Sequence, residues 1–145
     1  MYERIVMAYD GSQSGQKALL DCKEIAQWSR AKLHLVAVMP LNLSFVGIEG
    51  AVYDSEVEER ERGKYQGILD EGLAQLTQTG HAAQGELLVG DAVEEISRFA
   101  KKVEANLIIV GHKHLDSWAA RWWRGSVSSA LIERAPCSVL VAITS

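Results

Sequence analysis

Long hydrophobic runs are missing from this sequence of 145 residues. No segment approaches the roughly 20 consecutive apolar residues that a membrane-spanning helix requires, so we expect no membrane partner. The first apolar run, residues 5–9, is also far too short for the hydrophobic part of a secretory signal. We therefore expect a cytoplasmic protein.

Cysteines are also few, and the chain has no net positive charge. The two cysteines, Cys22 and Cys137, lie in apolar patterns and form no Cys-x-x-Cys pair, which favours free, buried thiols in a cytoplasmic protein. The formal net charge is −4, so the composition gives no reason to expect a nucleic acid as a partner. The whole chain, residues 1–145, is most simply a single domain that is large enough for a core.

The common catalytic motifs are absent as well. The sequence contains no Gly-x-Ser-x-Gly, no Gly-x-x-x-x-Gly-Lys and no Gly-x-Gly-x-x-Gly. The sequence shows no clear general base beside a nucleophilic side chain. These absences predict a protein that is not an enzyme.

Four short apolar runs are typical of buried strands. Each is aliphatic or β-branched and nearly continuous, as expected for strands that are covered on both faces of a parallel sheet. A fifth, partly alternating segment is a weaker candidate, and we expect it at an edge of the sheet. The four runs are residues 5–9, 33–39, 107–110 and 139–143, and the fifth segment is residues 83–89.

Amphipathic patterns of helical period fill the gaps between these strands. Strands and helices therefore alternate along the chain, which predicts an α/β fold with a parallel sheet and right-handed crossovers. Ser12 or Ser14 can cap the first helix and Asp91 the third, and Pro136 ends the fourth. The predicted helices are residues 12–30, 54–79, 91–103 and 126–133.

Candidate binding residues follow the predicted strands, at the edge where ligands bind in open parallel sheets. Asp10 comes directly after the first strand, and Gly111 follows the strand at 107–110. A carboxylate at this place accepts hydrogen bonds from an amine or a hydroxyl, or meets a metal bound to phosphate. Alternatively, Asp10 caps the first helix. The sequence leaves both interpretations open.

The stretch 107–128 contains a strand, a basic loop and the start of a helix. A helix N-terminus offers unpaired N–H groups and a partial positive charge, and both attract anions. Lys113, Arg121 and Arg124 add positive charge in the same loop. This order of features predicts a phosphorylated ligand.

In these segments the sequence resembles the universal stress proteins, a branch of the adenine-nucleotide α-hydrolase-like folds. The resemblance covers nearly the whole chain and implies an open five-stranded parallel sheet of order 3-2-1-4-5 with helices on both faces. It also implies a homodimer, in which the bare apolar edge strand from Ser138 to Ile143 pairs with its copy across a two-fold axis. The matching segments are residues 5–12, 90–96, 106–111, 125–128 and 135–141.

The resemblance also implies a role for each candidate residue. Asp10 and the backbone of Val38 hold adenine, Val110 with Gly111 holds ribose, and Tyr9 belongs to the turn that carries Asp10. The implied ligand is ATP or AMP, with or without Mg²⁺. The residues implied at the phosphates are Gly125, Ser126, Val127 and Ser128. Arg124, the basic residue directly before them, is a further candidate for nucleotide binding.

The glycine signature of the nucleotide-binding members is only partly present. That signature is Gly, two residues, Gly, nine residues, then Gly followed by Ser or Thr. Gly111 matches its first position, and Gly125 with Ser126 matches the last. His114 replaces the middle glycine, and ten residues separate it from Gly125. Because a Cβ and an imidazole can block the path of the phosphates, the sequence leaves open whether nucleotide binds.

The histidines of this region have simpler interpretations than metal binding. His112, His114 and Asp116 alternate as metal ligands do, but no further ligand cluster is visible. We therefore favour solvated or phosphate-facing histidines. His34, inside the second strand, is interpreted as a core or edge group with its hydrogen bonds satisfied.

Two apolar features remain to be placed. The tryptophans of the basic loop are expected to pack that loop against the domain rather than to stack on a base. The loop 40–53 is too apolar for a linker and is either a lid or a surface for a partner. The tryptophans are Trp118, Trp122 and Trp123.

Two functions remain open. The first is a stress-response switch that is gated by an adenine nucleotide, in which the ligand orders the loop 112–124. The second is a ligand-free dimeric interaction scaffold of the same family, whose basic, tryptophan-rich loop meets an unknown protein partner. Neither is an enzyme, and slow ATP hydrolysis is the most catalysis that we expect.

Overall fold

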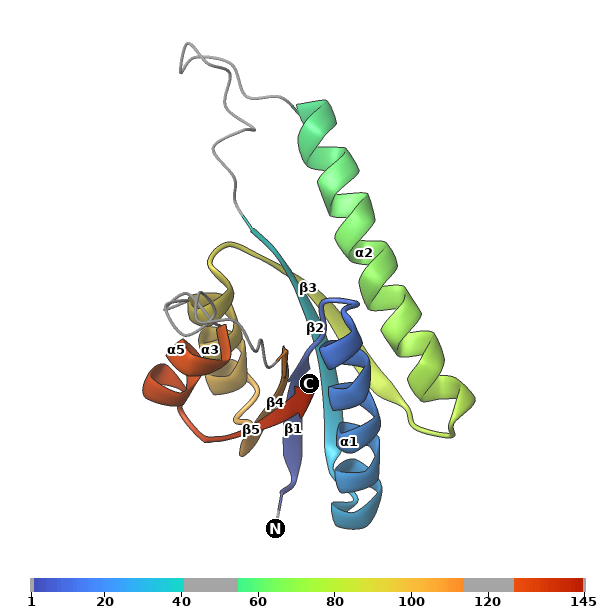
Figure 1. The fold of residues 1–145 in the computed structure, drawn as a ribbon, viewed down its shortest axis with the longest axis vertical. Coiled ribbons are helices and arrows are strands. Elements are labelled where there is room, and N and C mark those ends of the chain that lie inside the picture. The colour runs from blue at the N-terminus through green and yellow to red at the C-terminus, as the bar shows by residue number, and fades with distance from the viewer. Residues whose placement is uncertain (1, 41–54, 114–126, 145) are drawn as a thin grey trace.

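The computed structural model describes residues 2–40, 55–113 and 127–144. Within them, five parallel strands form one sheet in the order β3-β2-β1-β4-β5, which confirms the predicted fold class (Figure 1). None of the described helices is long and apolar enough to cross a membrane. The strands are β1 (Arg4–Ala8), β2 (Lys32–Met39), β3 (Ala83–Val89), β4 (Leu107–Lys113) and β5 (Ser138–Thr144). The helices are α1 (Gln13–Ser29), α2 (Ser55–Gln78), α3 (Ala92–Lys102) and α5 (Val127–Arg134).

Helices cover both faces of the sheet, with α1 and α2 on one face and α3 and α5 on the other (Figure 1). Successive side chains of a strand point to opposite faces. Met7 and Leu35 therefore pack beneath α1 and α2, whereas Val6 and Val36 pack against α3 and α5. All four side chains are fully buried. Burial on both faces is the physical reason for the continuous apolar runs in the sequence.

The two edges of the described sheet differ in character. β3 pairs only with β2, which confirms the expected edge position of residues 83–89. β3 exposes Gln84 and Glu86. β5 pairs only with β4 and carries no charged residue. One edge is therefore polar and the other aliphatic.

Side-chain caps begin two of the helices that follow strands. The Ser12 hydroxyl accepts a hydrogen bond from the Gly15 N–H at 3.0 Å and begins α1. The Asp91 carboxylate accepts one from the Glu94 N–H at 3.0 Å and begins α3. Both caps agree with the sequence prediction. They place the first turns of α1 and α3 directly after the carboxyl ends of β1 and β3.

The two cysteines are free, as predicted, but only one is fully buried. Burial first, and then the nearby charge of Asp21, raise the pKa of Cys22 to about 12. Cys137 is only partly buried, and burial raises the pKa of its thiol as well. A raised pKa keeps a thiol protonated and unreactive.

Candidate functional site

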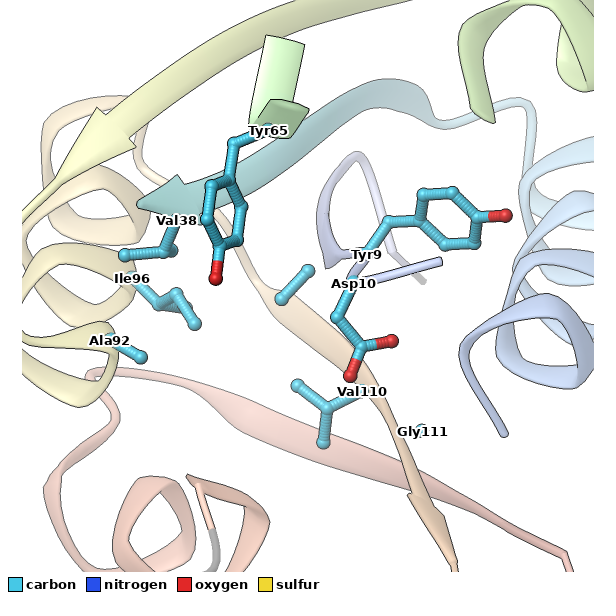
Figure 2. A pocket seen from close by; sticks show the side chains of 9 residues that line it. Tyr9, Asp10, Val38, Tyr65, Ala92, Ile96, Val110 and Gly111 are labelled. Atoms are coloured by element: carbon cyan, nitrogen blue, oxygen red, sulfur yellow. The ribbon is translucent and has the colours of Figure 1, made fainter. Parts of the chain in front are cut away.

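A hollow of about 130 Å³ opens at the carboxyl ends of β1, β2 and β4. β1 lies between β2 and β4 in the sheet. The chain passes from β1 to β2 on one side of β1 and later returns to β4 on its other side, so the strand order reverses here. Open parallel sheets bind ligands at such points. We call this hollow the switch-point pocket. It is lined by Ala8, Tyr9, Asp10, Val38, Tyr65, Ala92, Ile96, Val110 and Gly111 (Figure 2).

Asp10 places one carboxylate in the switch-point pocket. Its Oδ1 accepts hydrogen bonds from the Ser12 N–H at 2.9 Å and from the Ser12 hydroxyl at 2.5 Å. Because Ser12 is the cap of α1, the alternative in which Asp10 itself caps the helix is wrong. No hydrogen bond within the described residues reaches Asp10 Oδ2, and the carboxylate lies beside Val110 (Figure 2). One oxygen therefore orients the side chain, and the other is available to a ligand.

The first turn of α1 approaches this carboxylate closely because residue 15 is glycine. A Cβ at Gly15 would lie 2.7 Å from Asp10 Oδ1 and 3.2 Å from Ser12 Oγ. Gly11, with a φ of +78°, permits the turn between the strand and the helix. Gly15 was not predicted as part of the site from the sequence. Its signal was a glycine in the first turn of a helix, where glycine is unfavourable unless a close contact requires it.

Tyr9 lies beside the pocket, but its ring belongs to the core. The residue is 2% exposed, and its ring points away from the Asp10 carboxylate (Figure 2). Gly72 admits the ring, since a Cβ there would lie 2.9 Å from Tyr9 Cδ2. Burial first, and then the charges of Glu71 and Asp10, raise the Tyr9 pKa. Gln75 opposes this rise, although the Tyr9 hydroxyl forms no hydrogen bond within the described residues. Tyr9 therefore anchors the turn from the core side.

Three further predicted residues line the pocket. Val38 lies near the end of β2, and Val110 is a buried residue of β4. Gly111 follows Val110 and has no side chain that could fill the hollow. Together with Tyr9 and Asp10, these residues lie around one pocket, as the sequence predicted.

Helices α2 and α3 supply lining residues that the sequence analysis missed. Ala92 and Ile96 come from the first turns of α3. Tyr65 comes from α2, and its hydroxyl end reaches into the hollow (Figure 2). Lys64 Nζ lies 5.7 Å from the centroid of the Tyr65 ring, within the range of a cation–π contact. A tyrosine on an otherwise aliphatic helix face was the signal, because its hydroxyl needs a polar surrounding.

Much of the predicted phosphate region lies outside the described residues. Val127 and Ser128 begin α5, so the predicted helix start is confirmed there, and phosphate binding stays a prediction. Most of the loop 40–53 is also outside the described ranges. The other predicted residues outside them are Arg121, Arg124, Gly125, Ser126, His114, Asp116, Trp118, Trp122 and Trp123.

Metal binding finds no support in the described part of the chain. No group of three or more His, Cys, Asp or Glu side chains among residues 2–40, 55–113 and 127–144 could hold a metal ion. Asp10 is the only acidic residue that lines the switch-point pocket within these ranges. The described lining therefore offers one carboxylate, the Tyr65 hydroxyl and apolar surface.

Comparison with known proteins agrees with this architecture. The model of the universal stress protein family matches residues 1–142. A Staphylococcus saprophyticus protein that carries the name universal stress protein is 30% identical over 145 residues, which cover 99% of this chain and 84% of that protein. The crystal structure of a universal stress protein family member from Burkholderia pseudomallei has a TM-score of 0.75 and 27% identity. That alignment covers 97% of this chain and 95% of the other.

Solved structures of the same fold contain nucleotides, cAMP and AMP among them. A universal stress protein in complex with cAMP has a TM-score of 0.72 and 24% identity, and the match covers 99% of this chain and 98% of that one. A family protein from Arabidopsis thaliana with AMP bound has a TM-score of 0.72 and 17% identity, covering 99% and 92%. At these identities the likeness shows a shared fold. The match of the family model over nearly the whole length shows more: this chain belongs to the universal stress protein family.

Proposed function

We propose that this protein binds an adenine nucleotide, AMP or ATP, in the switch-point pocket and acts as a nucleotide-dependent switch in a cytoplasmic stress response. The observation that carries the proposal is the open Oδ2 of Asp10 at the carboxyl end of β1, beside apolar walls. The cAMP and AMP in two proteins of the same fold support this choice of ligand.

Asp10 favours adenine over other purines for a simple chemical reason. The exocyclic amino group of adenine donates hydrogen bonds, and an ionised carboxylate only accepts them. Hypoxanthine carries a carbonyl oxygen at that position and would be repelled. Val110, Ile96 and Tyr65 supply apolar surface for the faces of the base, and the backbone of Val38 supplies further hydrogen-bonding groups.

The positions that we propose for the ribose and the phosphates follow from placing adenine at Asp10. Ribose lies next to Val110 and Gly111, where the missing side chain leaves room. The phosphates lie at the residues from Gly125 to Ser128, because α5 begins at Val127 and a helix start offers free N–H groups. Mg²⁺ accompanies ATP in this proposal. Because His114 departs from the glycine signature, the phosphates need a test of their own.

Isothermal titration calorimetry with AMP, ATP and IMP, each with and without Mg²⁺, tests the proposal. We expect AMP to bind with an affinity on the order of micromolar. IMP should bind about tenfold more weakly or worse, because its carbonyl oxygen faces an acceptor that is then left unpaired. The absence of heat at millimolar nucleotide contradicts the proposal and favours the ligand-free interaction scaffold.

Two variants locate the base and the phosphates separately. Asp10→Asn keeps an oxygen for the Ser12 contacts and adds an amide donor, so the preference for AMP over IMP should disappear while thermal stability is kept. Gly125→Asp should abolish nucleotide binding without unfolding the protein. Glu94→Gln, an exposed change on α3 outside the pocket, is the matched control and should bind AMP as the wild type does.

The proposed switch is a homodimer and is not an enzyme, with slow ATP hydrolysis as its upper limit. The edge strand from Ser138 to Ile143 supports the dimer, because it is uncharged and Ile143 is 55% exposed. Exposed aliphatic edge strands tend to pair with another strand. Pairing with its own copy across a two-fold axis satisfies both strands at once.

A further inference from the structure

A second hollow lies on the face of the sheet that α3 covers, next to the β2–β3 edge. Its volume is about 320 Å³. It shares no lining residue with the switch-point pocket, although α3 borders both hollows. We call it the β3-edge hollow. The side chains that line it are His34, Gln84, Glu86, Phe99, Lys102 and Val103.

His34 is a buried polar side chain at the floor of this hollow. The residue is 7% exposed, and its ring meets the Phe99 ring edge-on, at 5.7 Å between centroids and an angle of 78°. The predicted core position of His34 is therefore confirmed. The imidazole forms no hydrogen bond within the described residues, and neither ring nitrogen is among their fully buried polar atoms that lack a partner. The ring of His34 is thus held in the core while its nitrogens remain accessible from the hollow that it lines. A ligand in the hollow can therefore form a hydrogen bond with this imidazole.

Two opposite charges line the same hollow without neutralising each other. Glu86 extends from β3 and Lys102 from the last turn of α3. Among the described ion pairs, none joins these two residues or involves either of them. Gln84 adds an amide that both donates and accepts. The hollow therefore presents an anionic group, a cationic group and neutral hydrogen-bonding groups together.

We propose that the β3-edge hollow is a second binding site, which takes a small zwitterion with an ammonium and a carboxylate group. Glu86 receives the ammonium, Lys102 receives the carboxylate, and the neutral imidazole of His34 hydrogen-bonds the ligand between them. Phe99 and Val103 provide apolar surface for the carbon skeleton. The chemical class is that of a free amino acid.

Charge complementarity selects a zwitterion over a simple ion. An anion alone gains Lys102 but meets repulsion from Glu86, and a cation alone gains Glu86 but meets repulsion from Lys102. A zwitterion satisfies both side chains and leaves neither charge facing a like charge. Discrimination between a zwitterion and its singly charged analogues is therefore the signature of this site.

NMR of the imidazole of His34 provides the test. The His34 signals are assigned by their loss in His34→Gln, and each of the standard protein amino acids is then added to the full-length protein. We expect a saturable shift of the His34 signals with at least one amino acid. For that amino acid, the amine without the carboxylate and the acid without the ammonium should each bind about tenfold more weakly or worse.

Variants of the two charged residues check the assignment of roles. Lys102→Met and Glu86→Gln should each weaken the amino acid by about tenfold, because each removes one charge-assisted contact. Lys101→Met is the matched control, since Lys101 is an exposed neighbour in the same helical turn and does not line the hollow. It should leave the affinity unchanged.

Three outcomes overturn the proposal. They are no saturable His34 shift with any amino acid, equal binding of the singly charged analogues, and an equal loss of affinity in Lys101→Met and Lys102→Met. The test involves neither a nucleotide nor the switch-point pocket, so its result does not depend on the proposed function.

Discussion

At the scale of single residues, Tyr65 is the described aromatic side chain that turns into the switch-point pocket, whereas the Tyr9 ring turns away (Figure 2). A nucleobase that stacks on an aromatic ring gains about 1–3 kcal/mol. Tyr65→Ala should therefore weaken AMP binding by about tenfold or more. Tyr65→Phe keeps the ring and should keep the affinity. Calorimetric titration of both variants with AMP measures the difference.

The control for this prediction is Gln66→Ala, which changes the next residue of α2 and leaves the pocket lining intact. It should bind AMP as the wild type does. If Tyr65→Ala binds AMP normally, the ring makes no contact with the base. If Tyr65→Phe loses as much affinity as Tyr65→Ala, the hydroxyl rather than the ring is the contact.

His34 makes the stability of the protein depend on pH. Burial first, and then the charge of Lys32, lower its pKa, while Glu86 opposes the shift. In the unfolded chain the imidazole has a pKa of about 6.5, so the unfolded state binds the proton more readily. Stability is then lost as pH falls below that value towards the lower pKa of the folded protein. The other charged side chain that lines the hollow, Lys102 on α3, also disfavours a second positive charge there.

His34→Gln should remove this part of the pH dependence. Between about pH 7.5 and about pH 5, the free energy of unfolding of the wild type should fall more steeply than that of the variant, by up to about 1.4 kcal/mol per pH unit. Urea denaturation at a series of pH values measures both curves. Parallel curves for the two proteins would show that the folded and unfolded states bind the His34 proton equally.

Sequence alone was sufficient to place those residues whose position at the pocket follows from their order in the chain. Asp10 and Gly111 come directly after apolar runs, and parallel strands bring their carboxyl ends to one edge of the sheet. Gly15 and Tyr65 could not be assigned in this way. The role of Gly15 depends on the distance to Asp10, and that of Tyr65 on how α2 crosses the end of the sheet.

At the scale of elements, four apolar runs and one partly alternating segment located the five strands of the described sheet, but they did not set the ends of these strands. β4 continues to Lys113, beyond the apolar run that ends at Val110. The ladder with β5 continues there, with Lys113 opposite Thr144. Backbone pairing with β5 extends β4 beyond its apolar residues. The pattern of side chains in the sequence contains no signal for such backbone hydrogen bonds. The helix starts were predictable because Ser12 and Asp91 are side-chain caps.

Two glycines of α2 provide a matched pair for the packing of this helix. Gly67 is exposed, and a Cβ there would have no neighbour within 4 Å. A Cβ at Gly72 would lie 2.8 Å from Leu35 Cδ2 and 2.9 Å from Tyr9 Cδ2. Gly67→Ala should therefore stabilise the protein by about 1 kcal/mol through helix propensity, whereas Gly72→Ala should destabilise it by about 1–3 kcal/mol through overpacking.

Urea denaturation of the two alanine variants measures this difference in the free energy of unfolding. Because both substitutions have the same chemistry in the same helix, helix propensity alone would give them the same sign. A stabilised Gly72→Ala would show that α2 does not pack closely on β1 and β2.

At the scale of the whole molecule, alternation of strands and helices predicted a parallel sheet but did not determine the order of its strands. Right-handed crossovers are compatible with several orders. The order with β1 at the centre came from the family resemblance, and the structure confirms it. This order places the reversal between β1 and β4, and the switch-point pocket opens there.

The same strand order leaves β3 and β5 at the two edges of the sheet. Their sequences differ in how readily each strand would pair with a strand of another molecule. β3 carries Glu86, and charged side chains protect an edge from pairing. β5 has no charged residue along Ser138–Thr144, and its Ile143 is 55% exposed. The proposed homodimer therefore forms through β5 rather than through β3.

Ile143→Lys tests this dimer with little effect on the monomer, because the side chain is exposed. In a two-fold interface a single substitution changes both partners. Ile143→Lys would therefore place two ammonium groups, one from each protomer, at the interface between the paired β5 strands. We expect sedimentation equilibrium to show a dimer for the wild type and a monomer for Ile143→Lys. Ala74→Lys is the matched control, because Ala74 is exposed on α2, which packs on β2 and β3 at the other edge of the sheet, and the dimer should persist. A monomeric wild type excludes pairing through β5, and equal dissociation of both variants places the interface elsewhere.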